Sequence, residues 1–235
     1  MGLFTRKNKQ KKEKELILTQ EVPFLVEEAY KSLRTNVGFS LLQEKNKIVE
    51  ITSAGQNEGK SVTAINLAIS LARNGAKVAL VDCDLRLPTV AQKLDIPQEP
   101  GLTQLLFDAD CRQEVICHHS SGVDVIPAGS LPPNPSEILG SPRMTETLEW
   151  LKEQYEYVIL DAPPVSVVTD AAVLAPKVSG IVLVVRQGQT REEGIDAAIA
   201  QLNMANGNIL GFVLTDAGAE QKTYGHYGYS RYQKQ

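Results

Sequence analysis

Gly59, Lys60 and Ser61 form a tripeptide whose residue types and order suit the binding of phosphate. A lysine at this position can place its ammonium on the β- and γ-phosphate oxygens of a nucleotide, and the hydroxyl after it can ligate Mg²⁺. Backbone N–H groups of the preceding loop and of a following helix N-terminus would cradle the same anion. The tripeptide therefore predicts a nucleotide-phosphate site, which comprises Ala54, Gly55, Gln56, Asn57, Glu58, Gly59, Lys60, Ser61 and Val62.

The segments on either side of this loop have the pattern that a phosphate-binding loop (P-loop) requires. Residues 48–51 form a mainly apolar run typical of a buried strand, and residues 61–74 carry apolar side chains at helical spacing. Ala54 stands where the motif usually has its first glycine, so the match to the motif is loose. The alternative is a helix-capping turn in which Gly-Lys-Ser occurs by chance. The order of strand, loop and helix favours the P-loop.

Aspartates follow two of the other predicted strands. Residues 77–81 form a second apolar strand, which ends in Asp82 and Asp84. At the spacing i, i+2 these carboxylates point to the same face, at the edge of a parallel sheet where ligands bind. The aliphatic residues 157–160 lead into Asp161, the Walker B pattern, whose carboxylate holds Mg²⁺ directly or through water. Two solvated turn aspartates are a weak alternative, because the P-loop lies only one strand–helix unit before Asp82 and Asp84.

Predicted strands and helices alternate along most of the chain. This alternation predicts an α/β fold of the P-loop NTPase class, in which helices cover both faces of a mostly parallel sheet. Besides the segments above, strands are predicted at residues 123–127, 178–185 and 209–214, helices at 101–107, 142–155 and 191–206, and a rigid proline-rich loop at 131–135.

Composition restricts the class of protein. With 235 residues and a hydrophobic fraction of 43%, the chain can bury a core of ordinary size. A net charge of −4 gives no case for nucleic-acid binding. Three cysteines without a CxxC motif fit a reducing cytoplasm, and Cys111, Cys117, His118 and His119 match no common zinc spacing. The sequence contains neither a signal-peptide pattern nor an apolar run of membrane-spanning length, so membrane attachment is expected only through a partner.

The N-terminal part contains two distinct segments ahead of a domain expected at residues 21–216. Residues 1–20 are rich in lysine and arginine, and they form either a solvated, disordered tail, which is favoured, or a contact for anionic lipid. Residues 23–43 have the apolar spacing of an amphipathic helix. Within it, Glu28, Lys31 and Arg34 recur at three-residue spacing, either as intrahelical ion pairs or as a contact between subunits.

Residues 217–235 form a tail of different composition. Tyr224, Tyr227, Tyr229 and Tyr232 lie within nine residues and are interleaved with glycine. The segment has neither aliphatic partners nor a sustained periodicity, so it is not a core pattern. Stacking on single-stranded nucleic acid is disfavoured because the chain is acidic. A tyrosine-rich tail attached to a nucleotide site suggests a substrate for phosphoryl transfer.

Further motifs complete a pattern that extends over nearly the whole chain. The chain resembles the bacterial tyrosine kinases of the capsule and exopolysaccharide type, the CpsD/CapB family (BY-kinases). The motifs are highly specific together, although no single one is. They lie at residues 28–36, 58–61, 81–88, 132–135 and 159–164 and in the terminal tyrosine cluster.

The resemblance implies a protein-tyrosine kinase that uses ATP and Mg²⁺. Lys60 would contact the β- and γ-phosphates of the nucleotide. The metal would be organised by Ser61, Asp84 and Asp161. Asp82 would accept the proton of the attacking tyrosine, so that it forms the expected catalytic set together with Lys60 and Asp84.

The resemblance also implies partners. The four terminal tyrosines would be autophosphorylated by a neighbouring subunit of a homo-oligomer, for which a ring is expected. Glu28, Lys31 and Arg34 match the family's ring-forming Glu-x-x-Arg-x-x-Arg, but a lysine in the middle position lacks the bidentate fork of arginine, which weakens such a contact. A separate, membrane-embedded polysaccharide chain-length regulator would activate the kinase at the inner face of the cell membrane. Other tyrosine-phosphorylated substrates and a cognate phosphatase are expected as further partners.

Two other functions are compatible with the same motifs. A partition or division-site positioning ATPase has this fold, but its loop carries a signature lysine where this chain has Gly55. A non-enzymatic, nucleotide-gated scaffold for polysaccharide assembly would use the tyrosines as docking residues. The presence of Asp82, Asp84 and Asp161 argues against the scaffold. A phosphotyrosine assay with ATP and Mg²⁺ separates the three functions.

Overall fold

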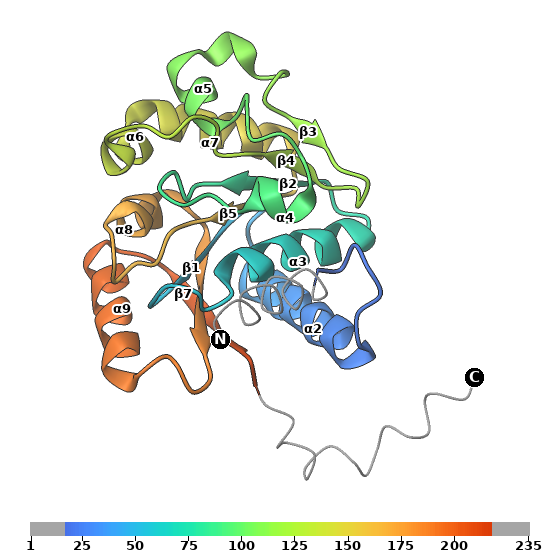
Figure 1. Ribbon diagram of the computed structural model, residues 1–235, viewed down its shortest axis with the longest axis vertical. Helices are drawn as coiled ribbons and strands as arrows, with labels where there is room; N and C mark the ends of the chain where they lie inside the picture. Colours follow the sequence, from blue (N-terminus) through green and yellow to red (C-terminus); the bar gives the residue numbers. More distant parts are fainter. Residues whose placement is uncertain (1–16, 218–235) are drawn as a thin grey trace, which may run out of the picture.

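A seven-stranded sheet forms the centre of the computed structural model, which describes residues 17–217 (Figure 1). The strands are β1 (Lys47–Ser53), β2 (Val78–Asp82), β3 (Cys117–His118), β4 (Asp124–Ile126), β5 (Tyr157–Asp161), β6 (Gly180–Arg186) and β7 (Ile209–Thr215). Their order across the sheet is β3-β4-β2-β5-β1-β6-β7. Only β3 and β4 pair in the antiparallel sense, and all other neighbours are parallel. The predicted mostly parallel sheet is confirmed.

Helices cover both faces of this sheet, as predicted (Figure 1). One face carries α2 (Phe24–Ser40), α3 (Lys60–Arg73) and α4 (Val90–Leu94). The opposite face carries α5 (Leu102–Phe107), α6 (Pro135–Gly140), α7 (Pro142–Gln154), α8 (Asp170–Leu174) and α9 (Glu192–Met204). Two short 3₁₀ helices, η1 (Ala109–Cys111) and η2 (Ala175–Lys177), complete the described secondary structure.

The core consists of two apolar layers that are separated by the sheet. Along β2, Val78 and Leu80 face the layer beneath α2, α3 and α4, whereas Ala79 and Val81 face the layer beneath α5 to α9. All four side chains are buried, because successive residues of a strand point to opposite faces and both faces are covered. Glu50, in the middle of β1, is also fully buried, and neither of its carboxylate oxygens has a hydrogen-bond partner among the described residues.

The predicted helices and strands are present, with ends shifted by a few residues. The helix predicted at residues 23–43 ends at Ser40, and the last residue of the predicted rigid loop, Pro135, begins α6. The helix predicted at residues 142–155 begins after Ser141, whose hydroxyl accepts the N–H of Met144 as an N-cap. The short elements α4, α8 and β3 were not predicted, because two to five residues are too few for a periodic pattern.

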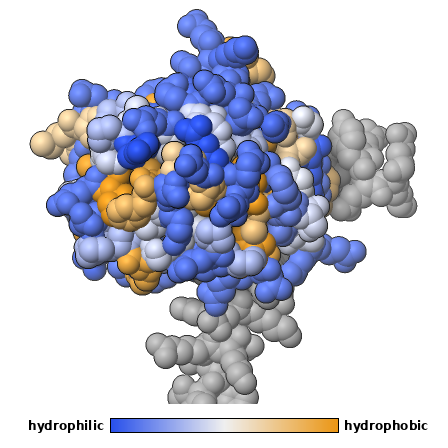
Figure 2. Space-filling model, turned by 90° about the horizontal axis from the view of Figure 1, so that it is seen from above, coloured by the Kyte–Doolittle hydropathy of each residue, from blue (hydrophilic) through white to orange (hydrophobic). Residues whose placement is uncertain are grey.

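Other sequence predictions concern the ends of the chain and its surface. Residues 1–16 and the four tail tyrosines, Tyr224, Tyr227, Tyr229 and Tyr232, lie outside the described residues. Between residues 17 and 217, the structure contains no helix that is long and apolar enough to span a membrane. The face seen from above is mostly hydrophilic, with smaller apolar areas between polar side chains (Figure 2). This mixture is ordinary for a folded domain.

Candidate active site

The phosphate-binding loop connects β1 to α3, as the sequence predicts. Gly59 has a left-handed backbone with φ of 93°, and a Cβ there would lie 3.2 Å from Cγ2 of Thr215. Glycine is therefore required at this position both for its backbone conformation and for the space it leaves. Ala54 is buried at the start of the loop, and its φ is not positive, so alanine fits where the motif usually has glycine.

The side chain of Glu58 closes the loop on itself. Its Oε2 accepts the N–H of Gly55 at 2.9 Å, and its Oε1 accepts the hydroxyl of Thr190 at 2.6 Å. The residue is only 3% exposed. Glu58 was predicted to bind the nucleotide, and the structure uses its carboxylate to shape the loop.

The ends of β6 and β7 brace the same loop from outside. Arg186, the last residue of β6, donates to the carbonyl oxygen of Asn57 at 2.6 Å and forms an ion pair with Asp216 at 2.7 Å. Thr215, the last residue of β7, donates to the carbonyl oxygen of Glu58 at 2.6 Å. Sequence reasoning did not assign Arg186 or Thr215 to the site. The only available signal was their position at the carboxyl ends of strands of a parallel sheet.

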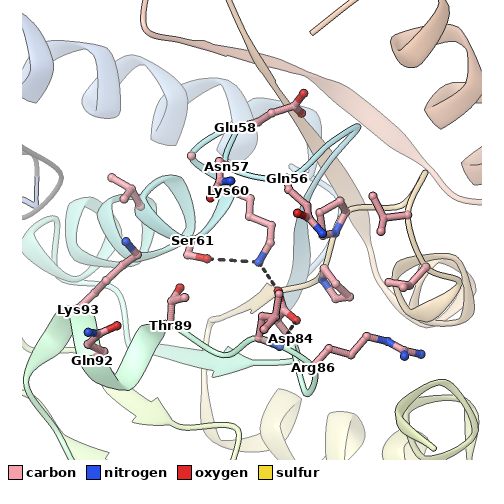
Figure 3. A pocket seen from close by; sticks show the side chains of 17 residues that line it. Gln56, Asn57, Glu58, Lys60, Ser61, Asp84, Arg86, Thr89, Gln92 and Lys93 are labelled. Carbon is pink, nitrogen blue, oxygen red and sulfur yellow. Dashed lines mark hydrogen bonds and ion pairs between the residues drawn. The ribbon is translucent and has the colours of Figure 1, made fainter. Parts of the chain in front are cut away.

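Lys60 lies at the centre of the site (Figure 3). Its ammonium is 2.8 Å from Oδ2 of Asp84 and 3.3 Å from Oδ1 of Asp161, with the Ser61 hydroxyl also at 3.3 Å. Burial lowers the pKa of Lys60, but the negative charges of Asp161 and Asp84 outweigh that effect and raise the pKa above its ordinary value. The lysine is therefore positively charged at neutral pH. The structure brings the adjacent residues Lys60 and Ser61 together with Asp84 and Asp161, which come from two other strand ends, as predicted.

Asp82 lies behind this group and does not line the cavity. It is fully buried, and its two oxygens accept the N–H groups of Asp84 and Val90, each at 3.1 Å. Burial and the neighbouring charge of Asp161 raise the pKa of Asp82 to about 8, against the opposing effect of Lys60. Its predicted role as the acceptor of the tyrosine proton requires the side chain to leave these backbone contacts. The role remains a prediction.

The carboxylates of the site have donor properties that fit Mg²⁺. Asp161 is fully buried, and its Oδ2 has no hydrogen-bond partner among the described residues. Burial raises the pKa of Asp161, and the ammonium of Lys60 counteracts this effect. Asp84 and Asp161 share the single ammonium of Lys60, so a bound cation would balance their remaining charge. Mg²⁺ typically takes one or two carboxylates together with phosphate oxygens and water, which Ser61, Asp84 and Asp161 can accommodate.

A cavity of about 500 Å³ opens in front of Lys60 (Figure 3). The phosphate-binding loop forms one wall with residues 56–62, all of which were predicted to bind the nucleotide. The predicted residues Ala54 and Gly55 do not line it. The opposite walls come from α4 and from the loop that follows β5, with Thr89, Gln92, Lys93, Pro163, Pro164, Val167 and Val168.

An ion pair connects the loops at the edge of this cavity. Arg86, four residues after the end of β2, donates to both carboxylate oxygens of Asp170, at 2.8 and 3.0 Å. Asp170 is fully buried at the start of α8, and it also accepts the hydroxyl of Ser136 from α6. The proline motif at residues 132–135 leads directly into Ser136. This cluster fixes the loop after β2 against two helices, and sequence reasoning did not predict it.

The residues predicted to join subunits make contacts within the chain. Lys31 pairs with Glu28 at 2.8 Å and with Glu27 at 3.4 Å, which is the intrahelical alternative. Arg34 donates to the carbonyl oxygen of Ser70 at 2.9 Å and so holds α2 against α3. These side chains are half-exposed at most, and the predicted subunit contact remains a prediction.

The cysteines and histidines that were considered for zinc have other contacts. His118 Nδ1 lies 2.5 Å from Oδ1 of Asp124, and Cys111 donates to the carbonyl oxygen of Asp108 at 3.0 Å. Within residues 17–217, no three His, Cys, Asp or Glu side chains are arranged to hold a metal ion. A site for Mg²⁺ therefore depends on phosphate and water oxygens in addition to the protein.

Relatives of this chain at 34–36% identity are named tyrosine kinases. The family model described as an AAA domain matches residues 46–209. Tyrosine-protein kinase YwqD of Bacillus subtilis (strain 168) is 36% identical over 226 residues, which cover 95% of both chains. Tyrosine-protein kinase CpsD of Streptococcus agalactiae is 34% identical over 204 residues, which cover 86% of this chain and 88% of the relative. The solved kinase domain of Escherichia coli tyrosine kinase ETK has a TM-score of 0.77 at 34% identity and covers 86% of each chain.

Proposed function

Since the chain belongs to the bacterial tyrosine-protein kinases, we propose that it transfers the γ-phosphate of Mg²⁺-bound ATP to tyrosine in the cavity in front of Lys60. The observation that carries this proposal is the contact of the Lys60 ammonium with both Asp84 and Asp161 beneath the phosphate-binding loop. The relatives' activity speaks against the two other functions that the motifs allow, a partition ATPase and a non-enzymatic scaffold.

The charged residues in the cavity and the buried Asp82 behind it have distinct tasks in this proposed reaction. Lys60 exchanges its carboxylate partners for the β- and γ-phosphate oxygens and neutralises the charge that develops on them. Ser61, Asp84 and Asp161 would hold Mg²⁺, which would supply further charge neutralisation. Asp82 accepts the tyrosine proton, after its carboxylate has turned away from the N–H groups that it now accepts.

The acceptors that we propose are the tail tyrosines of a neighbouring copy of the chain. Tyr224, Tyr227, Tyr229 and Tyr232 follow β7, the strand whose end braces the phosphate-binding loop. Copies assemble through the Glu28, Lys31 and Arg34 face of α2, with a ring as the expected form. The exposed apolar residues Phe24, Leu25, Phe39 and Leu42 at the ends of this helix and just after it support such an interface.

We place this activity in capsule or exopolysaccharide biosynthesis, under the control of a membrane-embedded chain-length regulator. Each phosphotyrosine adds about −1.5 to −2 charges, so several close together repel one another. Phosphorylation of the tail would open the oligomer, and a cognate phosphatase would restore it. A variant with all four tail tyrosines changed to phenylalanine should then stay assembled with ATP; dissociation like that of the parent contradicts the switch.

A mixing experiment tests transfer between subunits. Lys60→Met keeps its tail but loses its catalytic lysine, and the variant with four tyrosine-to-phenylalanine changes keeps its site but loses its tail acceptors. Each is incubated with ATP, Mg²⁺ and the membrane regulator, first alone and then together, and phosphotyrosine on the Lys60→Met chain is measured. We expect a signal there only in the mixture. Its absence from the mixture, when the parent is phosphorylated, contradicts transfer between subunits.

A further inference from the structure

Thr89 carries a buried hydroxyl that no contact within the fold explains. The residue precedes the first turn of α4, and its Oγ1 is buried without a hydrogen-bond partner among the described residues. A buried hydroxyl without a partner destabilises the fold, so folded proteins rarely retain one without a reason. Threonine at such a position usually caps the helix by accepting an N–H from its first turn.

Asp82 contacts the first turn of α4 at a different N–H group from the one that an N-cap hydroxyl accepts, which belongs to the second or third helical residue. Its Oδ2 accepts the N–H of Val90, the first residue of α4, at 3.1 Å. The side chain of Thr89 makes no capping hydrogen bond to this helix. Within residues 17–217 the hydroxyl thus has no partner, which leaves it available to a bound ligand.

The position of Thr89 identifies that partner. Thr89 lines the cavity in front of Lys60, on the wall opposite the phosphate-binding loop. Figure 3 shows its hydroxyl directed toward Ser61, the residue whose hydroxyl would ligate Mg²⁺. A group held between the loop and α4 would lie against Thr89 on the side away from the loop, and a small rotation of the side chain would bring its buried hydroxyl to that group.

We propose that the Thr89 hydroxyl binds the γ-phosphate–magnesium end of the nucleotide. A hydroxyl can donate to a γ-phosphate oxygen, which only the triphosphate supplies, or accept from a water molecule on a metal ion that the γ-phosphate positions. Thr89 would then distinguish the triphosphate from the diphosphate, whose remaining phosphates are held by the loop. This assignment rests on the proposed nucleotide site and adds a residue that neither the motif nor the relatives' names indicate.

The test compares nucleotide affinities of the full chain, measured by calorimetry. The ligands are ADP and the non-hydrolysable ATP analogue AMP-PNP, each with Mg²⁺ and with EDTA. We expect Thr89→Val to weaken binding of Mg²⁺–AMP-PNP about tenfold, because a hydrogen bond to a charged group is lost, and to leave the affinity for ADP unchanged. Thr89→Ser, which keeps the hydroxyl, should bind both ligands like the parent. A defect that persists in EDTA assigns the contact to the phosphate, and one confined to Mg²⁺ assigns it to a metal-bound water.

Thermal unfolding without nucleotide and a matched variant complete the test. Thr89→Val should unfold at the parent's temperature or above it, since it removes an unpaired buried hydroxyl. Thr145→Val, on the exposed side of α7, is the control and should not change either affinity. Equal affinities of Thr89→Val and parent for Mg²⁺–AMP-PNP overturn the assignment, and so does an equal loss for ADP. A parent chain that binds neither nucleotide overturns the proposed function itself.

Discussion

Thr215 Oγ1 donates a hydrogen bond of 2.6 Å to the carbonyl oxygen of Glu58, so the last residue of β7 is bonded directly to the phosphate-binding loop. Arg186 adds a second connection between the same strand end and the loop, through Asp216 and the carbonyl oxygen of Asn57. The phosphate-binding loop is thus held by Thr215 and Arg186, at the ends of the last two strands, and Thr215 lies just before the C-terminal residues begin. Its shape depends on these contacts as well as on its own glycine.

Removing the Thr215 hydroxyl should loosen the phosphate-binding loop. Thr215→Val keeps the shape of the side chain but loses the hydrogen bond to Glu58, which is worth about 0.5–1.5 kcal/mol. We expect affinity for ADP, measured by calorimetry, to fall about three- to tenfold, because the loop must then be ordered on binding. Thr215→Ser retains the donor and should bind like the parent. Unchanged affinity of Thr215→Val would show that the strand end does not position the loop.

Removing Arg86 should destabilise the chain by leaving the buried Asp170 carboxylate without its cation. We expect Arg86→Ala to lower the free energy of unfolding by about 1–3 kcal/mol, less than for a fully buried pair because the arginine is 40% exposed. Arg143→Ala removes an exposed arginine from a pair with Glu146 and is the matched control. Urea unfolding measures both variants. Equal stability of the two variants contradicts a structural role for the Arg86 pair.

Glu50 should make stability depend on pH. Burial raises the pKa of Glu50 well above its ordinary value, so the folded chain holds this carboxyl protonated while the unfolded chain ionises it near its usual pKa of about 4.3. Below a pH of about 4.3 both the folded and the unfolded chain hold the proton, so Glu50 does not reduce the stability there. As the pH rises from that value toward the pKa of Glu50 in the folded chain, the free energy of unfolding falls by up to about 1.4 kcal/mol per pH unit.

Glu50→Gln imitates the protonated carboxyl and removes this titration. Denaturation of both chains between pH 4.5 and pH 8 should show the variant gaining stability over the parent as the pH rises. The difference between the two chains isolates Glu50 from the other carboxylates. A difference that stays constant across the range contradicts a neutral, buried Glu50.

Substitutions of Lys31 and of Arg34 should have different effects on stability and on assembly. Arg34→Ala removes the hydrogen bond from α2 to the carbonyl oxygen of Ser70, so it should lower the unfolding temperature whatever the state of assembly. Lys31→Ala removes only exposed pairs within α2 and should leave that temperature nearly unchanged. If α2 forms the subunit contact, Lys31→Ala should nevertheless reduce the oligomer in light scattering. An unaltered oligomer in Lys31→Ala assigns the residue to its intrahelical pairs alone.

The centre of the site was predictable because its residues belong to local patterns at strand ends. Lys60 follows a strand and a glycine, and Asp84 and Asp161 each follow an aliphatic strand. In a parallel sheet the carboxyl ends of strands meet at one edge, so the pattern of the sequence was enough to bring these side chains together. The mostly parallel sheet was predictable for a similar reason, since long helical segments separate its strands.

The contacts that support the site from outside were not predictable, because they depend on how segments that are distant in the sequence pack against one another. Arg86 and Asp170 lie 84 residues apart, and Arg186 and Asn57 lie 129 residues apart. No periodic pattern encodes such a pair. The orientation of Asp82 is set by two backbone N–H groups, those of Asp84 in the loop after β2 and of Val90 in α4. Because α4 has only five residues, it is too short to be predicted from a periodic pattern.

The central claim is that the Lys60 cavity performs tyrosine phosphorylation, and one measurement tests it most directly. Parent, Lys60→Met and the control Lys152→Met, which changes a lysine of α7 far from the cavity in sequence, are incubated with γ-labelled ATP, Mg²⁺ and the membrane regulator. Phosphotyrosine is then quantified in each. We predict incorporation by the parent and by Lys152→Met, and a loss of at least about a hundredfold in Lys60→Met, because the charge on the transferred phosphoryl group is no longer neutralised. Equal incorporation by Lys60→Met and parent would contradict the account.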